Sequence, residues 1–199
     1  MRFKPISAVL AASAGALLLA GCVSIGGGGE PPEQLYTLTA SATVPAGAAS
    51  EGDMAGALAV TEPSVPHHLD ALRVPVQVNE VSLAYLQDAV WVEKPSRLFQ
   101  RVLAETIRAR SNRLVVGAGE LEYAAQTQLG GDLLAMEYDA RGSRVIVRYD
   151  AMLRLPDGTV RTRRFESEVT GIAADALVVG PALNRAANDV AAQVADWVG

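Results

Sequence analysis

The 199-residue sequence predicts an α+β (α/β) domain with a small, mainly antiparallel sheet that is packed by two main helices. One observation is a long meander pattern over residues 121–169, where apolar and polar residues alternate with the period of two that half-buried strands require. The others are two amphipathic patterns of helical period, over residues 95–110 and over the C-terminal residues from 180 onward. The length fits one domain with appendages.

The first 21 residues have the pattern of a bacterial lipoprotein signal peptide. Arg2 and Lys4 precede a charge-free apolar run over residues 6–20, which is shorter than the roughly 20 residues of a spanning helix. The sequence Leu19-Ala20-Gly21-Cys22 then matches the lipobox, in which the cysteine is lipidated and becomes the new N-terminus. The thiol of Cys22 would carry a thioether-linked diacylglycerol. The alternative is an ordinary signal peptide that happens to contain a cysteine.

The lipobox resemblance implies a periplasm-facing protein that is anchored in the outer membrane by acyl chains. Three chains are usual, and each buried CH₂ group contributes about 0.8 kcal/mol, so the anchor holds without a spanning helix. Val23 follows Cys22, and the absence of Asp at this position favours the outer over the inner membrane. Loss of residues 1–21 changes the net charge from −5 to −7. Neither value suits a general nucleic-acid binder, which carries a basic excess.

A tether is predicted over residues 22–33, where four glycines and two prolines occur, and a single domain over residues 34–199. The glycines do not predict a phosphate-binding loop, because neither a preceding strand nor a following Lys-Ser/Thr accompanies them. Residues 40–56 are rich in Ala, Gly and Ser and predict a flexible loop. Short strands are predicted over residues 34–39, 57–62, 73–79 and 89–92.

The first helix is predicted to begin at Pro95 or Ser96, with Ser96 as a suitable cap, and to end near Arg110. Its apolar stripe predicts a core-facing side made of Leu98, Phe99, Val102, Leu103 and Ile107. Four arginines lie mostly elsewhere on the helix: Arg97, Arg101, Arg108 and Arg110. We interpret them as a solvated face, and the alternative is a surface for lipid phosphates or an acidic partner.

The meander is predicted to contain a bulge at Gly130-Gly131, after which the inward side chains are Leu134, Met136 and Tyr138. A strand over residues 144–155, a tight turn at Pro156-Asp157-Gly158 and a return strand over residues 159–169 follow. The C-terminal helix is predicted to start at Gly180-Pro181. Its apolar row consists of Leu183, Ala187, Val190, Val194 and Trp197.

The sequence predicts no catalytic, cofactor or metal site, so we expect a protein that is not an enzyme. Serine-hydrolase, Walker and metalloprotease motifs are missing from the sequence. His67-His68 is interpreted as an exposed loop pair, because adjacent histidines on a strand point to opposite faces. Glu120 and Glu122 could form the carboxylate pair of a glycoside hydrolase, but alternating surface acids are common. The single cysteine excludes an intramolecular disulfide.

Several short segments of the mature chain occur in a characteristic order. They are Leu35–Leu38, Tyr85-Leu86, Ala89–Val92, Pro95–Leu98, Leu129–Leu133, Glu137–Asp139, Phe165-Glu166, and Pro181–Asn184 with Trp197-Val198. Together with the lipobox, this order resembles the ABC-type transport auxiliary lipoproteins, the PqiC-like family, over residues 34–198. Val92-Glu93-Lys94 departs from the family, whose members often have aromatic or small residues there.

The resemblance implies a small sheet flanked by helices and a partner role for an MCE-domain protein of an ABC-type lipid transporter. The implied work is to dock onto, or complete, a phospholipid conduit between the inner and outer membranes, driven by a separate cytoplasmic ATPase with its permease. A ring-like homo-oligomer is also implied. Two other functions stay open: a periplasmic lipid or lipoprotein chaperone with an acyl-binding cavity, and a structural lipoprotein of envelope assembly.

Overall fold

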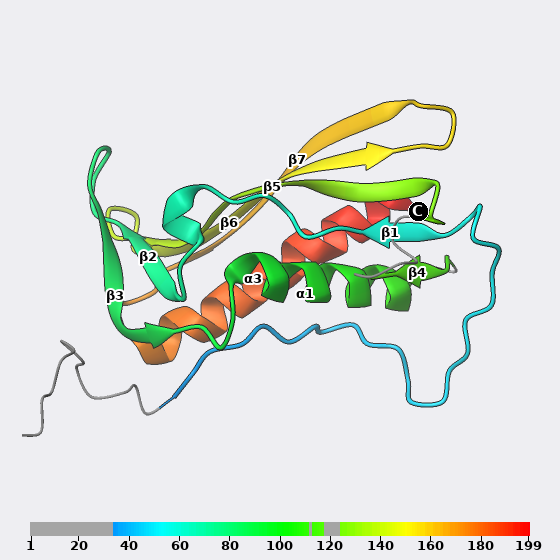
Figure 1. Ribbon diagram of the computed structural model, residues 1–199. Helices are drawn as coiled ribbons and strands as arrows, with labels where there is room; N and C mark the ends of the chain where they lie inside the picture. Colours follow the sequence, from blue (N-terminus) through cyan, green and yellow to red (C-terminus); the bar gives the residue numbers. More distant parts are fainter. Residues whose placement is uncertain (1–33, 112, 118–123) are drawn as a thin grey trace, which may run out of the picture. The chain divides into compact units, whose positions relative to one another are not determined.

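The structure, a computed structural model, describes residues 34–111, 113–117 and 124–199, and these belong to one compact unit. Within these ranges the elements in chain order are β1 (Leu58–Val60), a 3-10 turn (His67–Leu69), β2 (Arg73–Gln77), β3 (Leu83–Val90), α1 (Pro95–Arg110), β4 (Val115–Val116), β5 (Thr127–Asp139), β6 (Arg144–Arg154), β7 (Val160–Thr170) and α3 (Ala176–Val198) (Figure 1). None of the helices described is long and apolar enough to cross a membrane.

The seven strands form one mixed sheet that is organised around β5. Along one edge of β5, β6 pairs antiparallel over the whole length of the strand, and β7 pairs antiparallel with β6. Along the other edge, β1 and β2 pair parallel with the two ends of β5, and the Ser64–Asp132 bridge lies between them. The sheet is therefore mainly antiparallel by length, and the predicted α+β class is confirmed.

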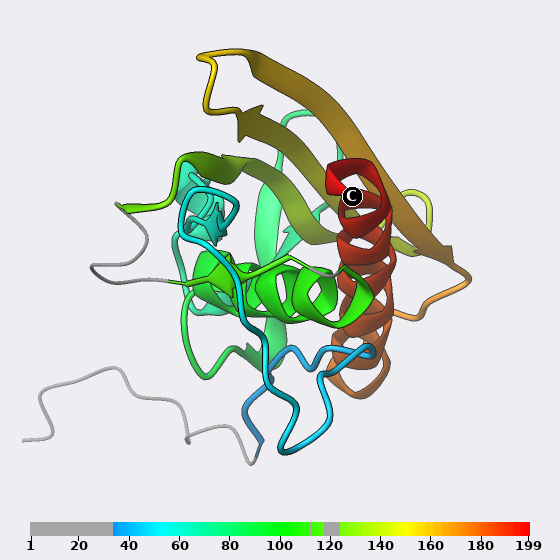
Figure 2. The same ribbon diagram turned by 90° about the vertical axis from the view of Figure 1, so that its right-hand side faces the viewer.

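Both described helices pack on the same face of the sheet and against each other (Figures 1 and 2). The inward side chains of β6 are those predicted from the alternation, and all are buried: Val145, Val147, Tyr149, Ala151 and Leu153. The ring of Phe99 in α1 meets the ring of Tyr149 edge-on, with the centroids 5.2 Å apart. The apolar stripe predicted for α1 is buried as well, so the core lies between β5–β6 and the two helices.

The opposite face of the β6–β7 hairpin carries a ladder of ion pairs. Arg164 donates two hydrogen bonds of 2.6 Å to the carboxylate of Asp150, which lies directly opposite it. Arg148 pairs with Glu166, also directly opposite. Arg144 reaches Glu168 at 2.7 Å. This ladder makes one face of the hairpin polar, as the sequence alternation predicts.

The bulge in β5 lies three residues beyond the predicted one. Gly130 and Gly131 pair regularly with β6, and the register shifts between Leu133 and Ala135. Leu133 is therefore fully buried, whereas Leu134 is not, which corrects the predicted inward set at that position. Gly131 instead allows the backbones of β5 and β6 to approach closely. It has a φ of +131°, and an added Cβ would lie 2.0 Å from the Asp150 carbonyl oxygen. Met136 and Tyr138 point inward as predicted.

Helix α3 begins at Ala176, four residues before the predicted start at Gly180. Asp175 caps the helix, since its Oδ1 accepts a hydrogen bond of 2.7 Å from the Leu177 N–H. Pro181 lies inside the helix. A proline there cannot donate a backbone hydrogen bond to the Leu177 carbonyl oxygen, and burial of Val179, Ala182 and neighbouring side chains in the core keeps the helix continuous through it.

Four other predicted details also differ from the structure. The predicted 34–39 strand is reduced to a single bridge between Tyr36 and Trp91, and the predicted 89–92 strand is the end of the longer β3. β5 begins at Thr127, and Ala124 is helical. Ser96 does not cap α1: Lys94 occupies the cap position, and the Ser96 hydroxyl donates to Glu62 Oε1 at 2.5 Å.

Candidate functional site

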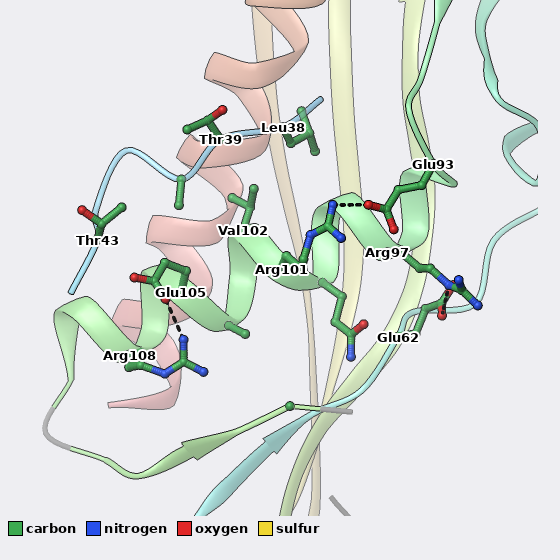
Figure 3. Close-up of a pocket in the computed structure, with 14 residues that line it drawn as sticks. Leu38, Thr39, Thr43, Glu62, Glu93, Arg97, Arg101, Val102, Glu105 and Arg108 are labelled. Carbon is green, nitrogen blue, oxygen red and sulfur yellow. Dashed lines mark hydrogen bonds and ion pairs between the residues drawn. The ribbon is translucent and has the colours of Figure 1, made fainter. Parts of the chain in front are cut away.

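A groove of about 790 Å³ runs along the outer side of α1 (Figure 3). One wall is the N-terminal segment, by which we mean residues 34–44, and the other walls come from the loops that follow β1 and β3. The lining residues are Leu38, Thr39, Ala40, Thr43, Glu62, Glu93, Arg97, Gln100, Arg101, Val102, Ala104, Glu105, Arg108 and Gly117. The groove thus depends on how the N-terminal segment is held against the helices.

The start of the N-terminal segment is held by aromatic packing. The Tyr36 N–H donates to the Val90 carbonyl oxygen, and the Val92 N–H donates to the Tyr36 carbonyl oxygen, both at 2.8 Å. The Tyr36 ring meets the buried Trp91 ring edge-on, with the centroids 6.2 Å apart. It also lies on Gly180 of α3, where an added Cβ would be 2.6 Å from two ring carbons. A side chain larger than glycine at position 180 would displace this ring.

The rest of the N-terminal segment is held by side-chain amides and a carboxylate. Asn184 Oδ1 accepts from the Thr39 N–H at 2.8 Å, and Asn188 Oδ1 accepts from the Ser41 N–H at 2.7 Å. The Asn188 amide also donates to the Thr39 carbonyl oxygen at 2.9 Å. Farther along, Glu105 Oε1 accepts from the Val44 N–H at 2.8 Å. These bonds give a segment without helix or strand a defined course across α1 and α3.

Three arginine–glutamate pairs line the groove (Figure 3). Arg97 Nε lies 3.3 Å from Glu62 Oε2, and Arg108 Nη1 lies 2.6 Å from Glu105 Oε2. Arg101 pairs with Glu93. The arginines differ in solvent access, since the Arg97 side chain is 62% exposed and that of Arg108 is 31% exposed.

Apolar residues lie beneath these charged pairs. Leu38, Val102 and Ala104 are buried residues that line the groove. The charges around it cancel, because every arginine faces a carboxylate. Such a surface does not favour a simple anion, which would have to compete with the internal carboxylates. It suits an extended ligand that offers both signs of charge and some apolar surface.

The structure brings together three of the four arginines that the sequence placed on one helix side. Arg97, Arg101 and Arg108 line the groove, whereas Arg110 pairs outside it with Asp196 of α3 at 2.8 Å. The predicted lipid anchor Cys22, with Leu19, Ala20 and Gly21 of the lipobox, lies outside the described residues. So do Glu120 and Glu122.

The adjacent histidines lie in the 3-10 turn before β2. His67 is exposed and His68 is partly buried, with its Nε2 3.6 Å from Glu137 Oε2. Burial lowers the pKa of His68 and raises the pKa of Glu137. In the ranges that the structure describes, no group of three or more His, Cys, Asp or Glu side chains is placed to hold a metal ion.

The residues that hold the N-terminal segment were missed by sequence reasoning. Asn184 and Asn188 lie on α3, and their partners are far away in the sequence, at separations of 145 and 147 residues. Glu62 and Glu93 also come from loops before and after β2–β3. The only local signal is that the two asparagines are spaced by four, which places them on one side of the helix.

The fold and the groove define an α+β domain with a surface suited to binding another molecule. The chain belongs to the family of ABC-type transport auxiliary lipoprotein components, whose model matches residues 36–195. This confirms the family predicted from the sequence. Membership in a lipoprotein family indicates a membrane-anchored protein of the cell envelope.

Solved structures share the fold at low sequence identity. Protein XCC0632 from Xanthomonas campestris is 19% identical, with a TM-score of 0.65 over 83% of this chain and 94% of that one. An uncharacterised protein is 16% identical, with a TM-score of 0.63 over 76% and 97% of the two chains. A PelC dodecamer from Paraburkholderia phytofirmans is 16% identical, with a TM-score of 0.41 over 71% and 87%. The chain has no significant match among curated proteins.

Proposed function

We propose that this chain is the outer-membrane-anchored auxiliary lipoprotein of an MCE-domain, ABC-type lipid transport system. The observation that supports it most is the family match over residues 36–195, which includes α1, most of α3 and nearly all of the N-terminal segment. In this role Cys22 carries the acyl anchor, and the folded domain supplies binding surfaces. The chemical work of transport belongs to a separate ATPase and permease, so the chain itself has no catalytic task.

The groove along α1 is the part of the domain that we assign to the MCE-domain partner. An extended partner segment would place apolar side chains over Leu38 and Val102 and exchange its charges with the internal pairs. Arg101 and Glu93 lie in the groove and are 56% and 30% exposed, so they can pair with a ligand without unfolding. Charge complementarity of this kind contributes to specificity and association rate more than to affinity.

Co-purification from detergent-solubilised envelopes tests this function. The wild-type chain is expected to recover an MCE-domain protein, identified by mass spectrometry. Repeated recovery of a barrel protein or peptidoglycan instead, with no MCE-domain protein, would contradict the proposal and favour a structural role in envelope assembly. Self-assembly of the chain stays a prediction, which native mass spectrometry of the same preparation tests.

A charge reversal in the groove tests the assigned surface. Arg101→Glu replaces a cation of the groove by a carboxylate beside Glu93, and we expect it to weaken partner binding about tenfold, which corresponds to about 1.4 kcal/mol. Arg110→Glu is the matched control on the same helix, since Arg110 pairs with Asp196 outside the groove. Equal recovery with both variants would remove the groove from the proposal without removing the partner.

The anchor is tested by Cys22→Ser, which removes the thiol that lipidation requires. We expect the variant to be released or mislocalised, while the wild-type chain sediments with the outer membrane. Separation of the two membranes on a density gradient distinguishes outer from inner membrane. If the variant still fractionates fully with the outer membrane, the acyl chains are not its main attachment.

A further inference from the structure

A cluster of exposed apolar side chains lies where the N-terminal segment enters the fold. We call this cluster the apolar end; it consists of Leu35, Leu72, Val92, Leu177 and Val178. Leu177 and Leu35 are the most exposed, at 68% and 58%. Large aliphatic side chains that gather on one part of a surface mark a contact with an apolar partner, whereas scattered ones do not.

Backbone contacts place these five residues close together at one end of the domain. Leu35 precedes Tyr36, which bridges to Trp91, and Val92 follows Trp91 directly. The Leu72 carbonyl oxygen accepts a hydrogen bond of 2.7 Å from the Trp91 N–H. The Tyr36 ring lies against Gly180, so the first turn of α3, with Leu177 and Val178, is adjacent. The Tyr36–Trp91 ring pair is thus the buried base of the apolar end.

Val160 is an exposed apolar residue that lies far from this cluster. Val160 begins β7, and the guanidinium of the next residue, Arg161, lies 5.4 Å from the Trp197 ring. Trp197 and Leu177 are at opposite ends of α3, which puts about 30 Å of helix between them. Val160 is 49% exposed, comparable to Val92 at 48%, so it offers a matched position that lacks the proximity to the N-terminal segment.

We propose that the apolar end lies on the surface of the bilayer that holds the acyl chains of Cys22. This inference rests on the proposed lipid anchor. Only 13 peptide units separate Cys22 from Leu35, which limits their separation to about 45 Å even in a fully extended chain. Leu35 is the exposed apolar residue of the described chain that follows Cys22 most closely in sequence, so the anchor keeps the apolar end within this distance of lipid.

The charges around the apolar end indicate which part of the bilayer it contacts. Asp70 and Lys94 form an ion pair of 2.6 Å with each other, and Asp175 caps α3. No basic cluster among the described residues accompanies the patch, so attraction to anionic headgroups does not explain it. The aliphatic side chains instead suit the boundary between headgroups and acyl chains. A weak contact of this kind becomes effective because the anchor makes it intramolecular.

Site-specific photocrosslinking tests the proposal in the full-length chain expressed in the cell envelope. A benzophenone amino acid replaces Leu177 in one variant and Val160 in the matched control. After illumination, mass spectrometry of the chain is expected to show phospholipid adducts at position 177 with a yield several-fold higher than at position 160. Equal yields at the two positions, or adducts at 177 only to protein, a second copy included, would overturn the proposal.

The intact mass of the same samples separates this proposal from the proposed anchor. An acylated Cys22 shows that the anchor is present, and the crosslinks then test the apolar end directly. If Cys22 is not acylated, the anchor proposal fails. The surface is then tested with the processed chain, residues 22–199, coupled through Cys22 to a maleimide-headgroup lipid in phosphatidylethanolamine-rich vesicles. There too, a phospholipid crosslink yield several-fold higher at position 177 than at position 160 is expected, and equal yields would overturn the proposal.

Discussion

The N-terminal segment is held at two places by different means. At Tyr36, a partly buried aromatic ring packs between Trp91 and the backbone of Gly180. At Thr39–Val44, the attachment consists of separate hydrogen bonds to Asn184, Asn188 and Glu105.

Because of this difference, the wall of the groove formed by the N-terminal segment can move locally while the segment stays attached to the domain. The Tyr36 ring packs as one rigid unit, so its contacts are lost together when it is displaced. A Cβ added at position 180 would overlap the ring and displace it. Single hydrogen bonds at a half-exposed surface are exchanged with water at a net cost of about 1 kcal/mol each. We therefore expect the segment to be fixed at Tyr36 and to open locally between residues 39 and 44.

The largest effect is expected from Gly180→Ala. In a helix interior this change usually stabilises a protein by about 1 kcal/mol, but here the Cβ would lie 2.6 Å from the Tyr36 ring. We expect the free energy of unfolding, measured in urea, to fall by about 2 kcal/mol, because overpacking displaces the ring. In a Tyr36→Ala background the same change should stabilise. Stabilisation in the wild-type background would show that the ring moves aside freely.

Asn188→Ala tests the polar attachment and should have a smaller effect. It removes the acceptor of the Ser41 N–H and the donor to the Thr39 carbonyl oxygen. We expect a loss of about 1–2 kcal/mol, since a buried hydrogen-bonding group loses its partners. Hydrogen exchange should accelerate at Ser41 and remain unchanged at Leu58 in β1. Equal acceleration of exchange at Ser41 and Leu58 would mean that the hydrogen bonds of residues 39–44 are lost together with the rest of the fold, and not locally.

Glu105→Gln should have a still smaller effect at the far end of the segment. A glutamine can still accept from the Val44 N–H, but it loses the ion pair with Arg108. We expect a loss of about 0.5 kcal/mol at low salt, typical of an i,i+3 pair on a helix. The difference in unfolding free energy between the variant and wild type should shrink as salt is added. A difference that does not depend on salt would mean that the loss comes from the hydrogen bond to the Val44 N–H, and not from the ion pair.

The smallest effect is a pH dependence at the aromatic attachment. Burial, and then the charge of Asp175, raise the pKa of the Tyr36 hydroxyl above its ordinary value of 10.0. The folded state therefore disfavours ionised Tyr36, and stability from this group is complete below about pH 10 and lost as pH rises through the raised pKa. Urea unfolding between pH 8 and 11.5 should show a steeper decline for wild type than for Tyr36→Phe. If stability falls with pH equally in the two proteins, ionisation of Tyr36 does not contribute to the decline.

The elements that depend on local chemistry could be predicted from the sequence. The helix over Pro95–Arg110 matches the structure at both ends, because proline fits a first turn and the apolar period is unbroken. The β6–β7 hairpin matches to within one residue, since Pro156-Asp157-Gly158 determines the turn. In the turn, Gly158 has a φ of +84°, which glycine adopts at no steric cost.

The parts that depend on distant pairing could not be predicted. The Gly180-Pro181 pair predicts a helix start by local rules, but the cap at Asp175 and core burial decide the true start. The groove needs contacts between positions 39 and 184 and between 62 and 97, which leave no periodic pattern in the sequence. Sequence reasoning could therefore find the arginines of the groove but not the carboxylates and amides that position its walls.

The ion-pair ladder on the β6–β7 hairpin has a consequence for how the chain reaches its native pairing. A slip of two residues keeps every side chain on its own face, so the apolar pattern alone does not prevent it. In one direction such a slip places Arg148 opposite Arg164, and in the other it places Asp150 opposite Glu166. Both juxtapose like charges, which is destabilising in a sheet. The charges thus select one register among those that the core would accept.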